Sequence, residues 1–139
     1  MANAIYPKFK EALLDGSANI DVNDGTVKAA LIDTGVYTYS TAHDFWDDAS
    51  AGVIGTPGTI ANTTVTNGLF DGDNVTFTAV SGSTAEAIII YIDTGTPSTS
   101  RLVSYHDTSV TGLPVTPNGG DITITWNASG IFQLSPNPL

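Results

Sequence analysis

Residues 85–92 read AEAIIIYI, and this stretch decides the fold. It is apolar at every position except Glu86, a pattern typical of a β-strand that is covered on both faces. We therefore predict a central strand over Ala85–Ile92. Its longest uninterrupted apolar run is Ala87–Ile92, far shorter than the ~20 residues that a membrane-spanning helix needs.

Other strands are expected on both sides of this one along the chain. Residues 75–79 alternate between apolar and polar side chains, which places Val75, Phe77 and Ala79 on an inner face. Turn-forming residues separate the strands at a regular spacing, which indicates an all-β sandwich or barrel. The remaining predicted strands are Thr26–Ile32, Thr59–Thr66, Arg101–Asp107, Asp121–Trp126 and Ile131–Leu134.

A short amphipathic helix is predicted before the first strand. Pro7 suits the first turn of a helix, and Gly16 suits the position just after its end. Elsewhere helix is expected to be scarce, because only two of the 14 acidic residues, Glu11 and Glu86, are glutamates, and aspartate favours turns.

Two local features are expected between the helix and the middle of the chain. The reversal at Asn23-Asp24-Gly25 predicts a hairpin that joins Ile20–Val22 to the strand over Thr26–Ile32. The aromatic segment Tyr37–Ala49 is predicted to be an ordered loop with one turn of helix through residues 43–46.

The fold class that these features indicate is all-β, a jelly-roll-like sandwich or barrel with a short N-terminal helix. A chain of 139 residues fits a single domain. We expect residues 1–18 to form an N-terminal arm and the short helix, residues 19–134 to form the β-sandwich domain, and residues 135–139 to form an extended C-terminal tail.

The charge balance is strongly acidic. The only cations are Lys8, Lys10, Lys28 and Arg101, and the formal net charge is -10. Binding to nucleic acid depends on clustered Lys and Arg, so neither nucleic acid nor an anionic membrane surface is expected as a partner. The absence of cysteine excludes disulfides, thiolate metal ligands and thiol catalysis.

Two Asp-Thr-Gly tripeptides, which begin at Asp33 and Asp93, suggest an aspartic protease. Each follows an apolar strand, as in that class of enzyme. The chemistry needs two carboxylates that share one proton, and the residues after each tripeptide differ from the small residue usual there. We interpret both as strands that end in a turn, and an aspartic-type hydrolase stays a remote alternative.

Both histidines, His43 and His106, precede an aspartate, as in some metal-dependent phosphohydrolases. No third or fourth ligand lies at a recognisable spacing, so no metal site is predicted. No cofactor site and no catalytic residues are predicted.

The aromatic residues of the loop are candidates for contact with another protein, since aromatic side chains dominate interface energetics. Filling of the core is the alternative interpretation. The candidate contact residues, including some from the two ends of the chain, are Ile5, Tyr6, Phe9, Tyr37, Tyr39, Phe45, Trp46, Pro138 and Leu139.

The N-terminal residues 1–14, which read MANAIYPKFKEALL, are similar to the start of small head decoration (cement) proteins of tailed bacteriophages. The similarity continues through residues 27–37, 70–82, 87–95 and 113–121, so it covers nearly the whole chain. The similarity is spread over the sequence as a whole and includes no catalytic motif.

This resemblance implies a structural protein that docks on the outside of an assembled head. The implied partners are the major capsid protein and a second copy of the chain in a homodimer. The implied location is the outer capsid surface of the virion, after synthesis in the host cytoplasm.

A tail or baseplate β-module that binds a receptor or glycan is the main alternative. In that case Tyr37, Tyr39 and Trp46 are expected to be exposed platforms.

Overall fold

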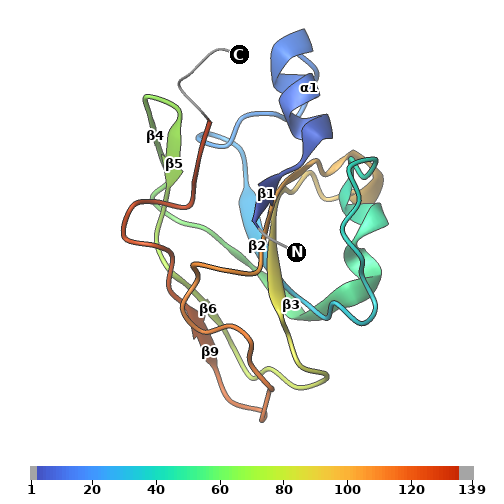
Figure 1. Cartoon of the computed structure of the whole chain (residues 1–139), viewed down its shortest axis with the longest axis vertical. Coiled ribbons are helices and arrows are strands. Elements are labelled where there is room, and N and C mark those ends of the chain that lie inside the picture. Colours follow the sequence, from blue (N-terminus) through green and yellow to red (C-terminus); the bar gives the residue numbers. More distant parts are fainter. Residues whose placement is uncertain (1–2, 135–139) are drawn as a thin grey trace.

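The strands between residues 3 and 134 pair into three antiparallel sheets (Figure 1). The structure is a computed structural model that describes residues 3–134. Strands make up 35% of it and helices 14%, so the predicted all-β fold with a short N-terminal helix is confirmed.

The largest sheet has five strands, and β7 lies at its centre. All six residues of β7 are buried, because both faces of the sheet are covered, and the predicted central strand is confirmed. The strands, in spatial order, are β1 (Ala4–Ile5), β8 (Leu102–His106), β7 (Ala87–Ile92), β2 (Val27–Ile32) and β3 (Val53–Thr59).

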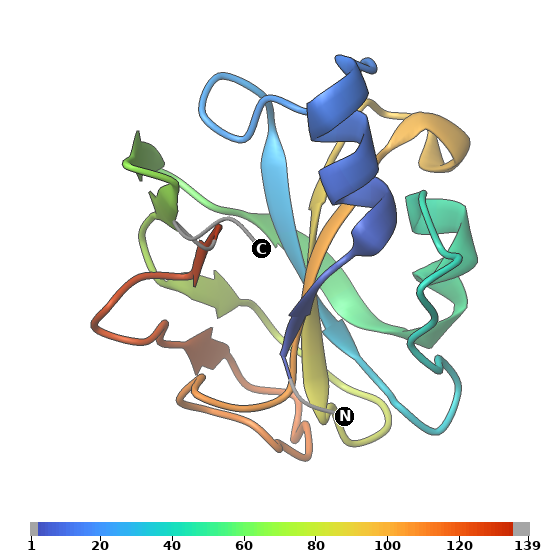
Figure 2. The same ribbon diagram turned by 45° about the horizontal axis from the view of Figure 1, so that its top comes forward.

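Two smaller sheets cover one face of the large sheet (Figure 2). Val75 and Phe77 point inward from this layer and are buried. Gly58 of β3 permits the close approach, since a Cβ added there would lie 2.5 Å from Val75 Cγ1. The strands are β10 (Phe132–Gln133), β5 (Leu69–Asp71) and β4 (Thr64–Thr66) in one sheet, and β6 (Val75–Phe77) and β9 (Ile122–Ile124) in the other.

The opposite face of the large sheet is covered by helix α1 (Pro7–Asp15) and by the segment from residue 37 to residue 52 (Figure 2). Pro7 occupies the first helical turn, and Gly16 ends the helix with a φ of 70°. The predicted helix is therefore confirmed. Two short 3₁₀ helices, η1 (Trp46–Asp48) and η2 (Ser50–Gly52), continue this layer; a third, η3 (Pro97–Thr99), precedes β8.

The predicted hairpin at residues 23–25 is wrong. Ile20–Val22 forms no strand, and β2 pairs instead with β3 and β7. The carboxylate of Asp21 accepts hydrogen bonds from the Asn23 and Asp24 N–H groups, so the turn is held locally. The turn residues do form a local reversal of the chain, but the partners of β2 are determined by pairing with strands distant in sequence.

Three smaller differences concern the ends of elements. Ala79 is exposed with a φ of 48°, because β6 ends at Phe77 and Val80 takes the buried position instead. The predicted strand over Thr59–Thr66 is split between the end of β3 and β4. The single helical turn begins at Trp46 and not at residue 43.

One continuous hydrophobic core joins these layers. It runs from Tyr6 and Phe9 at the N-terminal end, through the isoleucines of β7, to Ile131. The helix therefore packs into the same core as the strands.

Candidate protein-contact site

Four of the predicted contact residues lie in the core. Tyr6 is 0% exposed, Phe9 2%, Tyr37 4% and Trp46 8%. They are therefore core residues, and the core-filling interpretation holds for them. Of the other five, Ile5, Tyr39 and Phe45 are half-buried, whereas Pro138 and Leu139 lie outside the described residues.

Buried hydroxyl groups join α1 to the aromatic loop. The Tyr6 and Tyr37 hydroxyls are 2.8 Å apart, and the Tyr37 hydroxyl lies 2.8 Å from His43 Nδ1. Burial raises the pKa of Tyr37 to about 12 and raises the pKa of Tyr6 further. Both phenols therefore stay protonated at neutral pH and serve as hydrogen-bonding groups.

Beside this network lies a cleft of ≈ 520 Å³, which we call the tyrosine cleft. The Tyr39 ring lies 5.1 Å from the Tyr6 ring and 5.4 Å from the Tyr105 ring, centroid to centroid. Glu86 adds a carboxylate to the lining. The lining residues are Thr34, Tyr37, Thr38, Tyr39, Glu86, Tyr105, Asp107 and Pro114.

The position of Glu86 follows from the sheet. Its N–H donates to the Ile32 carbonyl, which places it beside the end of β2. Its Oε2 accepts hydrogen bonds from the N–H and the hydroxyl of Thr34, at 3.0 and 3.2 Å. These bonds hold the carboxylate at the cleft in one orientation.

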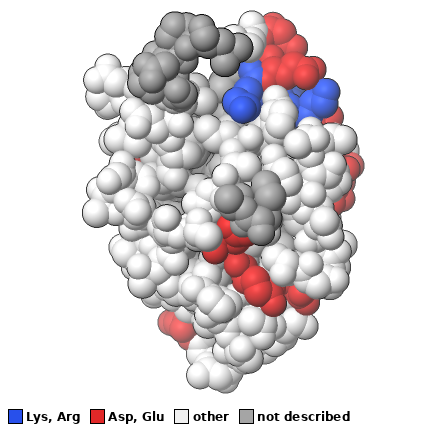
Figure 3. Space-filling view, in the orientation of Figure 1, with Lys and Arg blue, Asp and Glu red and all other residues white. Residues whose placement is uncertain are grey.

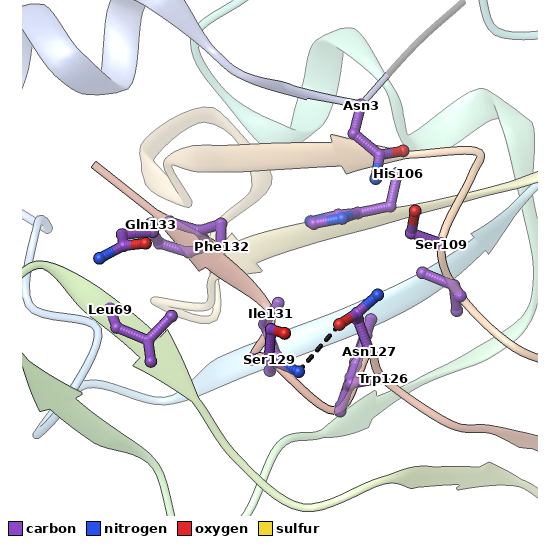
Figure 4. A pocket seen from close by; sticks show the side chains of 12 residues that line it. Asn3, Leu69, His106, Ser109, Trp126, Asn127, Ser129, Ile131, Phe132 and Gln133 are labelled. Carbon is purple, nitrogen blue, oxygen red and sulfur yellow. Dashed lines mark hydrogen bonds between the residues drawn. The ribbon is translucent and has the colours of Figure 1, made fainter. Parts of the chain in front are cut away.

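A second cleft, of ≈ 230 Å³, lies between β8 and the small sheets (Figure 4). His106 and Trp126 line it, and the figure shows the hydrogen bond from the Ser129 N–H to Asn127 Oδ1 at its edge. Ser104 Oγ lies 2.8 Å from His106 Nε2. Since Ser104 is 0% exposed, this pair is a buried structural contact and not an accessible nucleophile.

Burial lowers the pKa of His106 to about 4. The nearby Asp107 carboxylate opposes this shift but does not reverse it. The His106 imidazole is therefore neutral at pH 7.

Large apolar side chains are exposed at four positions in the described part of the chain. Leu14, on the last turn of α1, is 91% exposed, far more than any of the others. Lys8 and Lys10 are on the same helix, and Figure 3 shows Lys and Arg gathered at this end of the visible face. The other three are Val36, Val65 and Leu134.

Cations and carboxylates lie side by side at the α1 end of the large sheet, where Lys8 pairs with Glu11 at 3.2 Å (Figure 3). Lys28, at the start of β2, pairs with Asp93 at 2.9 Å, and Arg101, just before β8, donates two hydrogen bonds to the Ala18 carbonyl. All four cations thus lie at the α1 end. The opposite ends of β2, β7 and β8 are flanked by Asp33, Glu86 and Asp107. Acidic side chains also gather near the middle of the face in Figure 3, away from the cations.

The two Asp-Thr-Gly tripeptides are not brought together. Asp33 follows β2 and Asp93 follows β7, and these strands are antiparallel neighbours. At ~3.4 Å per residue the two aspartates are therefore roughly 20 Å apart. Each carboxylate accepts the N–H of the glycine two residues on, at 2.8 and 2.9 Å, which is the strand-end turn that the sequence indicated.

Two further possibilities raised by the sequence are a metal site and a glycan-binding surface. Within residues 3–134 no three His, Asp or Glu side chains are arranged to hold a metal ion. Tyr37 and Trp46, predicted as platforms for the glycan-binding alternative, are buried, and only Tyr39 is partly open.

No protein-family model and no curated protein matches this chain. Over the part that the structure describes, no helix is long and apolar enough to cross a membrane.

Proposed function

We propose that this chain is a head decoration protein of a tailed bacteriophage, which binds the outside of the assembled head and stabilises the lattice of the major capsid protein. The proposal includes self-association as a homodimer and a place on the outer surface of the virion. It starts from the resemblance of residues 1–14, 27–37, 70–82, 87–95 and 113–121 to that family.

The observation that carries the proposal is the exposed end of α1. Leu14 is 91% exposed, although burial of a leucine side chain is worth about 1.5–3 kcal/mol. The helix carries two lysines, Lys8 and Lys10, and two carboxylates, Glu11 and Asp15, so it has no net side-chain charge. A large apolar side chain exposed at the end of such a helix is suited to contact with a protein partner. This helix belongs to the same N-terminal segment that carries the resemblance.

The physical mechanism is linkage. A protein that binds the assembled lattice but not the separated subunits shifts the equilibrium toward the lattice. A copy that contacts two capsid subunits also gains from effective concentration, because the second contact forms within the complex. Modest interfaces, of about 800 Å² per partner, then suffice for firm attachment.

The test is co-sedimentation of the purified chain with heads that lack it. The wild-type chain is expected to sediment with these heads and to raise the temperature at which they release DNA. Failure to sediment at micromolar concentration contradicts the proposal.

Two surface variants make the test specific. Leu14→Ser is expected to weaken binding, because it removes the exposed apolar contact. Val65→Ser is the matched control, since Val65 is also exposed but lies on β4, in one of the small sheets on the other side of the large sheet from α1. Equal binding by Leu14→Ser and the wild type excludes this end of α1 as the contact.

A further inference from the structure

We propose that the tyrosine cleft is a receptor for one Arg or Lys side chain of the capsid protein. This inference rests on the proposed function for the identity of the partner. It assigns a different surface from the exposed end of α1, with a different chemistry of recognition.

The walls of the cleft are aromatic. Tyr39 is half-buried, and its ring makes tilted contacts with the Tyr6 and Tyr105 rings, which restrict its orientation before any ligand arrives. Tyr37, also in the lining, is anchored by its hydroxyl to Tyr6 and His43. A cation that lies against a fixed tyrosine ring is attracted to the π face, and guanidinium groups also stack on it.

A carboxylate is placed at the same cleft. Oε2 of Glu86 is occupied by the two hydrogen bonds from Thr34, while Oε1 accepts none from the described residues. Glu86 is half-buried, so solvent screens its charge less than that of a fully exposed carboxylate. Burial raises the pKa of Tyr105, and the charges of Asp107 and then Glu86 add to this effect.

Among the described residues, no Lys or Arg side chain lines this cleft. Its four Lys and Arg residues lie at the α1 end, where Lys28 is paired with Asp93 and Arg101 is bonded to Ala18. Charge complementarity therefore favours a cationic occupant from a partner. An aromatic wall beside a carboxylate selects a side chain with both an apolar stem and a charged end, which describes Arg and Lys.

The experiment compares two variants that each remove one negative charge. Glu86→Gln keeps the shape of the side chain and the oxygen that accepts from Thr34. Asp24→Asn is the control, because Asp24 is exposed near the opposite end of β2 and its carboxylate accepts no hydrogen bond from residues 3–134. Thermal unfolding of both variants checks that the fold is retained.

Binding to heads that lack the protein is then measured by co-sedimentation at low and at high salt. Glu86→Gln is expected to weaken binding about tenfold or more and to reduce its salt dependence, whereas Asp24→Asn changes it less than about twofold. If wild-type protein binds and Glu86→Gln binds equally well, the cleft is not the receptor, and the proposed function stands. If the wild type does not bind, both fall.

A second measurement does not need the heads. Nα-acetyl-arginine amide is titrated into the free protein while the Tyr39 and Tyr105 ring signals are followed by NMR, with the citrulline amide as the neutral probe of the same shape. Shifts with the arginine probe alone, absent in Glu86→Gln, support the assignment. The assignment is overturned if the arginine probe causes no shifts or if both probes cause equal shifts. It is also overturned if the protein self-associates in a salt-sensitive way that Glu86→Gln abolishes.

Discussion

The Trp46 ring lies flat on the Tyr91 ring, with centroids 4.3 Å apart and an interplanar angle of 5°. Tyr91 belongs to β7, the central strand, and Trp46 begins η1 in the aromatic loop. This stack therefore attaches the loop to the middle of the sheet. Because the loop also supplies Tyr37 and Tyr39 to the tyrosine cleft, the stack helps to hold the cleft in shape.

Trp46→Ala is expected to lower the free energy of unfolding by about 3–5 kcal/mol, because it leaves a large cavity over Tyr91. The measurement is urea unfolding followed by circular dichroism. Val65→Ala, at a residue that is 49% exposed, is the control and is expected to change the free energy by less than about 0.5 kcal/mol. A loss below about 1 kcal/mol for Trp46→Ala contradicts the role of the stack.

Tyr37→Phe is expected to destabilise the protein more than Tyr6→Phe does. The Tyr37 hydroxyl lies between Tyr6 and His43, so its removal leaves the fully buried Tyr6 hydroxyl without its partner, at a cost of about 1–3 kcal/mol. Removal of the Tyr6 hydroxyl leaves Tyr37 still bonded to His43. Chemical unfolding of the two single variants and the double variant measures the order, and a larger loss for Tyr6→Phe contradicts the network as described.

Alkaline pH is expected to destabilise the fold, in part through Tyr91. Burial, followed by the charge of Asp93, raises the pKa of Tyr91 to about 12. Since an unfolded tyrosine titrates near 10, the unfolded chain loses this proton first, and stability falls as the pH rises from about 10 toward 12. Tyr91→Phe should show a shallower fall of the unfolding free energy over this window. An unchanged slope indicates that Tyr91 ionises freely in the folded state.

Mild acid is expected to destabilise the fold through His106. Its folded pKa is lowered to about 4 by burial, whereas an unfolded histidine titrates near 6.5. Between these values the unfolded chain binds a proton that the folded chain excludes. The unfolding free energy should therefore fall as the pH drops from about 6.5 to 4, by at most about 1.4 kcal/mol per pH unit.

His106→Gln should remove this slope, and the His106 ring signals in NMR should not titrate above about pH 5 in the wild type. The pKa values of the Asp21 and Asp93 carboxylates are lowered, so these groups affect the unfolding free energy only below the pH range in which His106 acts. The two effects can therefore be measured separately. A His106 titration midpoint near 6.5 contradicts the buried, neutral imidazole.

The candidate site was only partly predictable. The density of aromatic residues at positions 37–46 correctly marked a segment that packs firmly, but it did not separate core from surface. Tyr37 and Trp46 are buried against Tyr6 and Tyr91, which lie far from the loop in sequence. Glu86 was visible only as the exception in an apolar run, and its place in a cleft depends on Thr34 and the end of β2.

The sequence alone determined the strand and the helix that depend on neighbouring residues in the chain. The apolar run at residues 87–92 specified a buried central strand, and Pro7 with Gly16 bounded the helix, because side-chain burial and backbone φ act within a few residues. Only the tertiary structure decided the partners of β2, the burial of Tyr37 and Trp46, and the separation of cations from the tyrosine cleft. Those outcomes depend on contacts between residues far apart in the chain, where several pairings satisfy the same local pattern and packing selects one.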